Sequence, residues 1–251
     1  MAGAAGFALI EQSVAGMGTA YAGAAATADS VDTLYFNPAG MVRLPGTQSG
    51  AAVHLVRPKT EFNNEDSRFV TMAPIQGDDG GDAGGLAAVP HFYLTHQVGD
   101  TTWLGLAVNA PFGLTTEYDG DWVGRYHAIK SEVETVNINP SIGVRVNDQL
   151  SIAAGASVMY LEGEFTNALD FGLLLDPALA GTLDGKSRIE GDSWGWGFNL
   201  GLLFEPSLTT RIGVHFRSEV SQDIEGDAEF KQVPVTLQPV FSDTDIEVDI
   251  D

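Results

Sequence analysis

The sequence predicts an all-β protein, an antiparallel transmembrane β-barrel, and three observations lead to this fold class. From residue 48 onward, apolar side chains alternate with small or polar ones at a period of two. The connections between the alternating runs are short and long in turn, which is typical of barrels with tight turns at one end and long loops at the other. Glycine is abundant, with 30 of 251 residues, while charged residues make up only 18%, against roughly 25% in soluble domains.

The run from Ser193 to Phe204 shows the alternation most clearly. Successive side chains of a strand point to opposite faces, so one face of this strand is bulky and apolar. A soluble β-sandwich or lipocalin-like barrel also alternates, but its water-facing strands are usually charged. Here the second face carries Gly, Ser and Asn, which favours a strand between lipid and a lumen. The apolar set is Trp194, Trp196, Phe198, Leu200, Leu202 and Phe204.

Other stretches repeat the pattern and predict seven strands and the start of an eighth in all. Aromatic residues near the strand ends match the girdles that flank the apolar band of a membrane barrel. These aromatic residues are Trp103, Tyr160, Trp194 and Phe204. The other strands are expected within 48–60, 86–97, 103–110, 135–146, 151–160, 212–219 and 244–251, and the long loops within 61–85, 113–128, 164–192 and 230–243.

Charge and composition exclude several classes of protein. The 12 basic and 34 acidic residues give a net charge of 12 − 34 = −22, which argues against a nucleic-acid partner because phosphate binding needs clustered Lys and Arg. The absence of cysteine excludes disulfides and thiolate metal sites. The sequence contains no run of about 18 consecutive apolar residues, so it does not predict a transmembrane helix.

We expect neither a metal site nor a cofactor nor catalysis. The five histidines lack metal-ligand spacing, and the acidic stretch Asp78 to Asp82 lacks the full EF-hand pattern. Gly191-Asp-Ser-Trp194 is similar to a lipase block, but no helix is predicted beside it and no paired histidine is apparent. The sequence therefore predicts a protein that is not an enzyme.

Residues 5–46 differ from the rest of the sequence because small side chains dominate them. They predict a compact segment that fits a confined space, helical in part between residues 8 and 26. Asn37-Pro-Ala-Gly40 predicts a turn, since the residue before a proline leaves helical space. Residues 1–4 contain a small-x-small pattern typical of signal cleavage, so they are either a signal-peptide remnant or a flexible start.

Several motifs in consistent order resemble one known family. The first is Glu11-x-Ser13-x-x-Gly16-x-Gly18-x-Ala20-x-Ala22-Gly23, preceded by Ala5-Gly-Phe7 and followed by Asp29 and Asn37-Pro-Ala39. Ala110-Pro-Phe-Gly-Leu-Thr-Thr-Glu-Tyr118, Gly195-Trp-Gly-Phe-Asn199 and Phe216-Arg-Ser-Glu-Val220 come later. Together they resemble the FadL/TodX family, outer-membrane transporters of long-chain fatty acids and other hydrophobic compounds.

The resemblance implies a fourteen-stranded barrel with an N-terminal hatch in its lumen. Residues 1–46 would be the hatch, and residues 47–251 about half of the barrel. Because the chain stops inside an alternating run, we expect a fragment truncated at its C-terminal end. The alternative is a small eight-stranded barrel, but side chains fill such a lumen and leave no room for a hatch. The hatch motif would comprise Gly16, Gly18, Asn37, Pro38 and Ala39.

The resemblance also implies passive uptake of a fatty acid or hydrocarbon across the bacterial outer membrane. The expected surroundings are outer-membrane lipid and lipopolysaccharide, and the expected state is a monomer. A kinked third strand would form a lateral exit, since Pro111 donates no ladder hydrogen bond and Gly113 relaxes the backbone; an ordinary strand end is the alternative. The exit residues would be Asn109, Pro111, Phe112 and Gly113.

The stretch 164–185 is too apolar for a plain solvent loop and predicts a capture site for a hydrophobic solute, unless it is a loop core packed on its neighbours. Its candidate residues are Phe165, Leu169, Phe171, Leu173, Leu174 and Leu175. A fatty-acid carboxylate would need a cation where the sequence has Glu162 and Glu164. Lys186 and Arg188 follow later and could supply that cation. An uncharged solute would need no cation and would not be repelled by the two glutamates. The alternative functions are a structural or adhesive barrel without transport and a barrel lipase.

Overall fold

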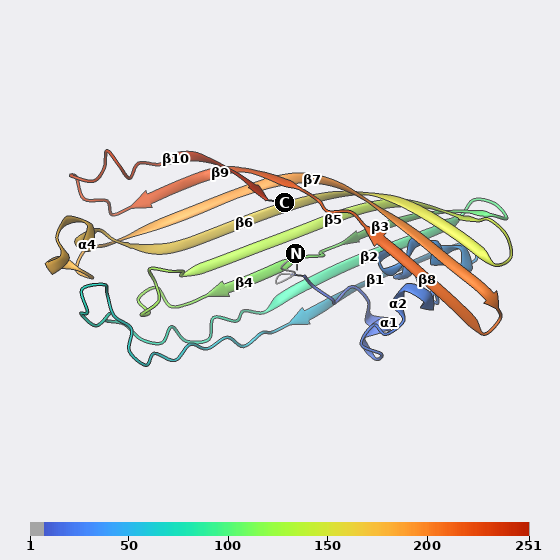
Figure 1. Cartoon of the computed structure of the whole chain (residues 1–251), viewed down its shortest axis with the longest axis horizontal. Coiled ribbons are helices and arrows are strands. Elements are labelled where there is room, and N and C mark those ends of the chain that lie inside the picture. The colour runs from blue at the N-terminus through green and yellow to red at the C-terminus, as the bar shows by residue number, and fades with distance from the viewer. Residues whose placement is uncertain (1–7, 251) are drawn as a thin grey trace.

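The computed structural model describes residues 8–250 as one antiparallel sheet with a short N-terminal segment against it (Figure 1). The expected signal remnant, residues 1–4, and Ala5-Gly-Phe7 lie outside this range. No helix in the described part of the chain is long and apolar enough to cross a membrane.

The ten strands pair in the order β1-β2-β3-β5-β6-β7-β9-β10, with β4 also on β5 and β8 also on β7. Because β3 and β4 share one neighbour and β8 and β9 share another, the ten strands fill eight positions across the sheet, as the alternation predicts. Within residues 8–250, β1 and β10 do not pair with each other. The strands are β1 (Thr47–Val56), β2 (Ala87–Gln97), β3 (Thr102–Asn109), β4 (Gly113–Glu117), β5 (Lys130–Arg145), β6 (Leu150–Asp170), β7 (Asp184–Ser207), β8 (Thr210–Arg217), β9 (Gln222–Lys231) and β10 (Thr244–Ile250).

The long-loop boundaries were predicted wrongly in three places. Residues 164–192 are mostly strand, since β6 continues to Asp170 and β7 begins at Asp184, with only α4 (Phe171–Leu175) and the 3-10 turn Pro177–Leu179 between them. Similarly, β4 occupies the start of the loop expected at 113–128, and β9 lies where no strand was expected. In β6, β7 and β9 the alternation continues with charged residues, which are also typical of loops, although the backbone remains paired. β4 follows the interruption at Pro111, which ends the alternation of β3 before it.

The two faces of the sheet separate as the alternation predicts. Trp194, Trp196 and Phe198 are 58%, 72% and 49% exposed, whereas Ser193 and Asn199 on the other face are buried. Trp103 is an exception to the predicted girdle. It shares a face with Ala107 and Asn109, is buried, and donates its indole N–H to the Leu44 carbonyl at 2.8 Å.

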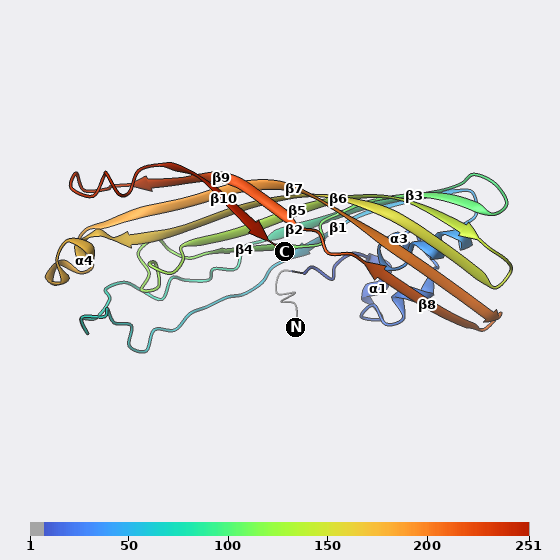
Figure 2. The ribbon, with the colours of Figure 1, turned by 45° about the horizontal axis from the view of Figure 1, so that its top comes forward.

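The N-terminal segment packs on the small, polar face of the sheet, near the short turns (Figure 2). Its core residues Leu34, Met41 and Val42 are buried with Tyr93, Trp103 and Leu203 of the sheet. Glycine makes this approach possible, because a Cβ at Gly213 would lie 1.9 Å from the Ala25 carbonyl oxygen. The segment contains the short helices α1 (Val14–Met17), α2 (Ala24–Thr27) and α3 (Thr33–Phe36) and the 3-10 helix Pro38–Arg43.

Candidate functional site

The third strand is interrupted at the predicted place. β3 ends at Asn109 and β4 begins at Gly113, and both pair with β5. Asn109 opposes Asn137 and Gly113 opposes Glu134, so the three residues 110–112 face only the two residues 135–136. The Thr135 hydroxyl replaces the missing ladder contact, because it accepts from the Phe112 N–H at 3.0 Å and donates to the Phe112 carbonyl at 2.7 Å. The sheet is therefore kinked and bulged here.

The interruption leaves an unpaired interval between β2 and β4. β2 pairs with β3 up to the His91–Asn109 pair, and beyond it residues 87–90 pair only with β1. β4 pairs only with β5. Contact between the two sides resumes at the Gly84–Thr116 bridge, next to a hydrogen bond of 3.0 Å from Glu117 N–H to the Ala83 carbonyl. Over the interval, no ladder hydrogen bond joins the two sides among the described residues.

The sheet face that carries Trp194, Trp196 and Phe198, here called the lipid-side face, has a depression beside this interval. A depression of about 440 Å³ extends from β1 to β5, and small or apolar side chains form most of its wall. Because Asn109 and Ala110 contribute to it, the depression reaches the break itself. Its lining includes Ala51, Val53, Pro90, Phe92, Val108 and Val136.

On the opposite face, the first described residues of the chain cover the break. Leu9 N–H donates to the Pro111 carbonyl at 2.9 Å, and Ala8 forms a β-bridge with Phe112. Leu9 also packs on Gly113, where a Cβ would lie 3.2 Å from Leu9 Cδ1. All four predicted exit residues thus contact the N-terminal strap, which we define as residues 8–12. Asn109 does so through its Nδ2, which donates to Gln12 Oε1 at 2.8 Å.

The predicted hatch residues lie at two places in the N-terminal segment. Asn37 is buried and caps the 3-10 helix that begins with Pro38, since its Oδ1 accepts from Ala39 N–H at 3.1 Å. Gly16 and Gly18 lie at α1, where Gly16 N–H donates to the Ser13 hydroxyl at 2.9 Å and Gly18 is the C-cap. Asn37 touches the sheet, whereas a side chain at Gly18 would meet open space.

The six predicted capture residues do not form one loop. Phe165 and Leu169 lie within β6, and only the other four belong to α4 at the tip of the β6–β7 hairpin. Phe171 is fully buried and contacts Phe241 at 5.2 Å between ring centroids, while Leu174 and Leu175 are exposed.

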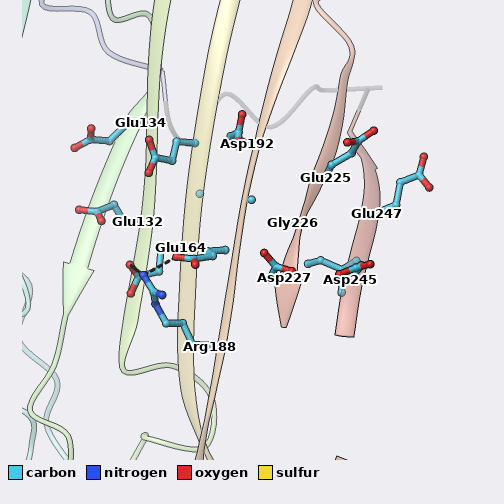
Figure 3. A pocket seen from close by; sticks show the side chains of 15 residues that line it. Glu132, Glu134, Glu164, Arg188, Asp192, Glu225, Gly226, Asp227, Asp245 and Glu247 are labelled. Atoms are coloured by element: carbon cyan, nitrogen blue, oxygen red, sulfur yellow. Dashed lines mark hydrogen bonds and ion pairs between the residues drawn. The ribbon is translucent and has the colours of Figure 1, made fainter. Parts of the chain in front are cut away.

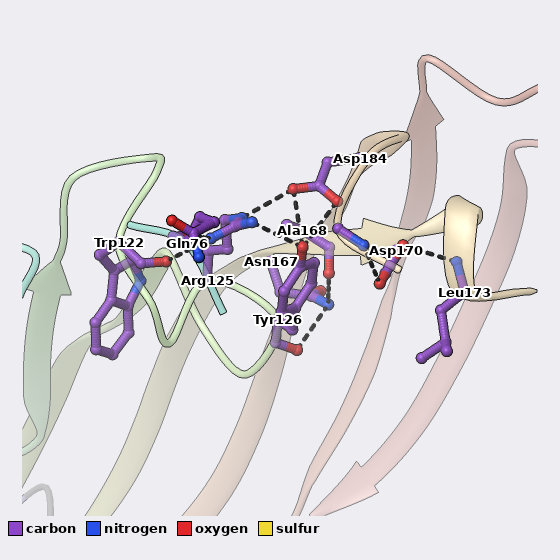
Figure 4. A network of polar contacts seen from close by, with 10 residues as sticks. Gln76, Trp122, Arg125, Tyr126, Asn167, Ala168, Asp170, Leu173 and Asp184 are labelled. Atoms are coloured by element: carbon purple, nitrogen blue, oxygen red, sulfur yellow. Dashed lines mark hydrogen bonds and ion pairs between the residues drawn. The ribbon is translucent and has the colours of Figure 1, made fainter. Parts of the chain in front are cut away.

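Sequence reasoning missed a polar cluster that ties the long loops together (Figure 4). The buried Arg125 guanidinium donates to Asp184 at 2.9 Å, where β7 begins, and to the Gln76 carbonyl at 2.8 Å in the loop before β2. The Tyr126 hydroxyl donates to Asp184 at 2.9 Å, and burial together with this hydrogen bond raises the pKa of Tyr126. The only sequence signal was that Arg125 is the sole Lys or Arg between residues 113 and 129.

A second missed feature is an acidic surface on the lipid-side face, just beyond Tyr160 and Trp194 (Figure 3). The strand register places two rows of carboxylates across five neighbouring strands, around a depression of about 790 Å³. The first row is Glu134, Glu162, Asp192, Glu225 and Glu247, and the second is Glu132, Glu164, Glu190, Asp227 and Asp245.

The two cations at the edge of this acidic surface are committed to ion pairs. Arg188 contacts Glu164 at 3.0 Å and Glu190 at 2.5 Å, and Lys130 contacts Glu132 at 2.5 Å. The Arg188 hydrogen bond holds the pKa of Glu164 below its usual range. Arg188 is therefore not available for a solute carboxylate. Within the described residues, no three His, Asp or Glu side chains are arranged to hold a metal ion.

Comparison with known proteins places these features in a family context. The family described as "Outer membrane protein transport protein (OMPP1/FadL/TodX)" matches residues 1–245. A Neisseria meningitidis protein assigned by name to the outer membrane is 30% identical over 90% of this chain and 52% of its own length. The long-chain fatty acid transport protein of Escherichia coli O6:H1 is 28% identical over 89% of this chain and 52% of its own length.

Two solved structures share the fold. A Pseudomonas aeruginosa FadL homologue superimposes with a TM-score of 0.80 at 19% identity, over 88% of this chain and 58% of that protein. The Pseudomonas putida toluene transporter TodX gives a TM-score of 0.61 at 18% identity, over the same shares of the two chains. The chain spans about half the length of the curated relatives it matches.

Proposed function

Because the chain belongs to the OMPP1/FadL/TodX family of outer-membrane transport proteins, we propose that it carries a hydrophobic solute passively across the bacterial outer membrane and releases it sideways through the β2–β4 interval. One observation carries this proposal. The interval lacks ladder hydrogen bonds, opens toward an apolar depression on the lipid-side face, and is covered by the N-terminal strap on the other face.

The physical reason for a lateral route is the cost of opening a sheet inside lipid. An unpaired backbone group in the hydrocarbon region costs several kcal/mol, so paired strands do not separate to let a solute pass. Between β2 and β4 that cost is already avoided, because Pro111 has no N–H to satisfy and Thr135 binds Phe112. The solute moves from the lumen to lipid without breaking a ladder.

In this proposal the long-loop end captures the solute. The loops tied by Arg125 form a fixed rim, and the exposed Leu174 and Leu175 of α4 offer apolar contact there. Burial of each CH₂ group contributes about 0.8 kcal/mol, which is enough for capture without covalent chemistry. The N-terminal segment acts as the hatch, since it is packed on the face opposite to the apolar, lipid-facing side chains.

The relatives include a protein named for long-chain fatty acid transport and another named for toluene. For this chain, the acidic surface and the pairing of Arg188 and Lys130 favour an uncharged solute such as a hydrocarbon over a fatty-acid anion. A carboxylate approaching the acidic surface meets like charge, and neither of these two cations is free to bind it. Lys186, the other cation that the sequence offers here, is exposed, lies beyond this surface opposite Lys231 and forms no ion pair among the described residues.

The test is to repair the third strand in the complete protein. Deleting Pro111 and changing Ala110 and Phe112 to Thr and Val leaves two residues opposite residues 135–136 and restores the ladder. We expect binding of a radiolabelled hydrocarbon to persist in detergent while its uptake by cells falls. Pro206→Thr, at the edge of a short turn, is the matched control. Undiminished uptake through a repaired wall contradicts lateral exit, and absence of uptake by the unaltered protein favours a structural or adhesive barrel.

A further inference from the structure

We propose that the Gln12 side chain is the latch that keeps the N-terminal strap across the break, so that its release sets how fast the exit opens. This inference rests on the proposed lateral route and adds to it the residue that governs the route. Gln12 is fully buried, although the other strap residues, 8–11, are exposed or half-buried.

All hydrogen-bonding atoms of the Gln12 amide are used at the break. Its Nε2 donates to the Ala110 carbonyl at 2.7 Å and to the Leu9 carbonyl at 3.2 Å. Its Oε1 accepts from Asn109 Nδ2 at 2.8 Å. One side chain therefore joins the strap to the last residue of β3 and to the first residue of the break, 97 and 98 positions away.

The amide replaces what a continuous strand would supply. Residues 110–112 lie outside the ladder, so the Ala110 carbonyl has no strand partner on the β2 side. A buried carbonyl without a partner is costly, and Gln12 removes that cost in the closed state. Asn109 is held in place in turn, because its Oδ1 accepts from Asn137 Nδ2 at 3.1 Å.

The strap can leave the break without unpacking the rest of the segment. It ends at Gln12, and the hydroxyl of the next residue, Ser13, caps α1 and contacts Asp32. Further along, Asn37 binds the sheet independently of the strap. Within the strap, the contacts that hold Ala8 and Leu9 over the break are a single bridge and a single backbone hydrogen bond. The Gln12 main chain is held as well, because its carbonyl accepts from the Tyr93 hydroxyl at 2.9 Å. The Gln12 amide adds the two side-chain hydrogen bonds that join the strap to residues 109 and 110.

The first experiment separates a latch from an ordinary stabilising residue. Gln12→Met keeps the length and apolar stem of the side chain but removes every amide hydrogen bond, and Gln149→Met in an exposed short turn is the control. We expect uptake of the neutral probe N-phenyl-1-naphthylamine to rise about tenfold, equivalent to about 1.4 kcal/mol in the opening equilibrium. Thermal unfolding of the purified barrel should show that it remains folded. Unchanged or slower uptake in a folded Gln12→Met barrel overturns the latch.

The second experiment closes the strap covalently. The chain contains no cysteine, so Ala8→Cys with Phe112→Cys introduces one defined pair at the strap bridge. We expect oxidation to stop uptake and a reductant to restore it, while each single variant is insensitive to both. If the oxidised pair still transports but repair of the third strand abolishes uptake, the latch is wrong and the lateral route stands. If the repair leaves uptake unchanged, the lateral route itself fails.

Discussion

Asn37 Nδ2 donates to the Leu202 carbonyl of β7 at 2.9 Å, although the two residues are 165 positions apart in the chain. The same amide nitrogen donates to the Ala25 carbonyl at 2.7 Å, while Oδ1 accepts from Ala39 N–H. A single buried side chain thus folds the N-terminal segment on itself and attaches it to the sheet. Gly201 makes room for it, since a Cβ there would lie 2.4 Å from Asn37 Oδ1.

We expect Asn37→Ala to destabilise the folded protein by about 1–3 kcal/mol, because it leaves two carbonyl groups and one N–H without their partner. Thermal unfolding of the purified barrel measures the loss. Gly201→Ala should produce a similar loss by clash from the sheet side, and the double variant should cost less than the sum of the two. Additive losses would show that the two residues do not act on one contact.

Arg125→Ala should loosen the long-loop end without affecting the short turns. It leaves Asp184 without its cation and the Gln76 carbonyl without a donor, so we expect a loss of about 1–3 kcal/mol and faster limited proteolysis between residues 61 and 85. Lys231→Ala is the control, since Lys231 pairs with Glu229 at an exposed site outside this segment. Equal protease sensitivity of the two variants would refute the role of Arg125 in ordering the loops.

The sequence alone predicts the structural features that a pattern of neighbouring residues marks. The alternation around Trp196 predicts the strand and its lipid-facing side, and Pro111 with Gly113 predicts the interruption of the third strand. In contrast, Gln12 and Arg125 act through partners that are 98 and 59 positions away. No local pattern marks either residue, because only the strand register brings those partners together.

The acidic surface shows why a charged run was misread. Glu162, Glu164 and Glu190 alternate with other residues as strand residues do, but polarity at the end of an apolar run is also typical of a loop. The backbone stays paired beyond the lipid because its hydrogen bonds are satisfied by β5, β6, β7, β9 and β10, whatever the side chains are. The two carboxylate rows form only because the register of five paired strands aligns their side chains, and this register cannot be read from any one strand.

Two neighbouring carboxylates of this surface should respond in opposite directions to neutralisation. Glu162 faces Glu134 and Asp192 across the strands, so Glu162→Gln should stabilise the protein by about 0.2–1 kcal/mol by removing like-charge repulsion. Glu164 binds Arg188 and Lys130, so Glu164→Gln should destabilise it at neutral pH. Thermal unfolding at low and high salt measures both effects, which should shrink as salt increases.

The pH dependence of Glu164 has a definite sign. Its pKa in the folded protein is lowered from 4.5, first by the hydrogen bond from Arg188. Its stabilising contribution is therefore present above pH 4.5 and is lost as the pH falls through the lowered value. Unfolding measured from neutral to acid pH should show this loss in the unaltered protein but not in Glu164→Gln. An identical acid limb in both would exclude Glu164 as its source.

The lipid-facing side of β7 is tested by one substitution at two places. Leu200 is 48% exposed in the middle of the apolar run, and Leu208 is fully exposed in the short turn after β7. A lysine near the middle of the bilayer costs about 2–4 kcal/mol in a membrane barrel, whereas a lysine in water costs almost nothing. We therefore expect Leu200→Lys to lower barrel stability in lipid vesicles by this amount and Leu208→Lys to leave it unchanged. In a soluble sheet both positions would face water, and the two lysines would be equally tolerated. Equal stability of the two variants in vesicles would thus contradict a lipid-facing Leu200, and with it the assignment of the Trp194–Phe204 face to the membrane.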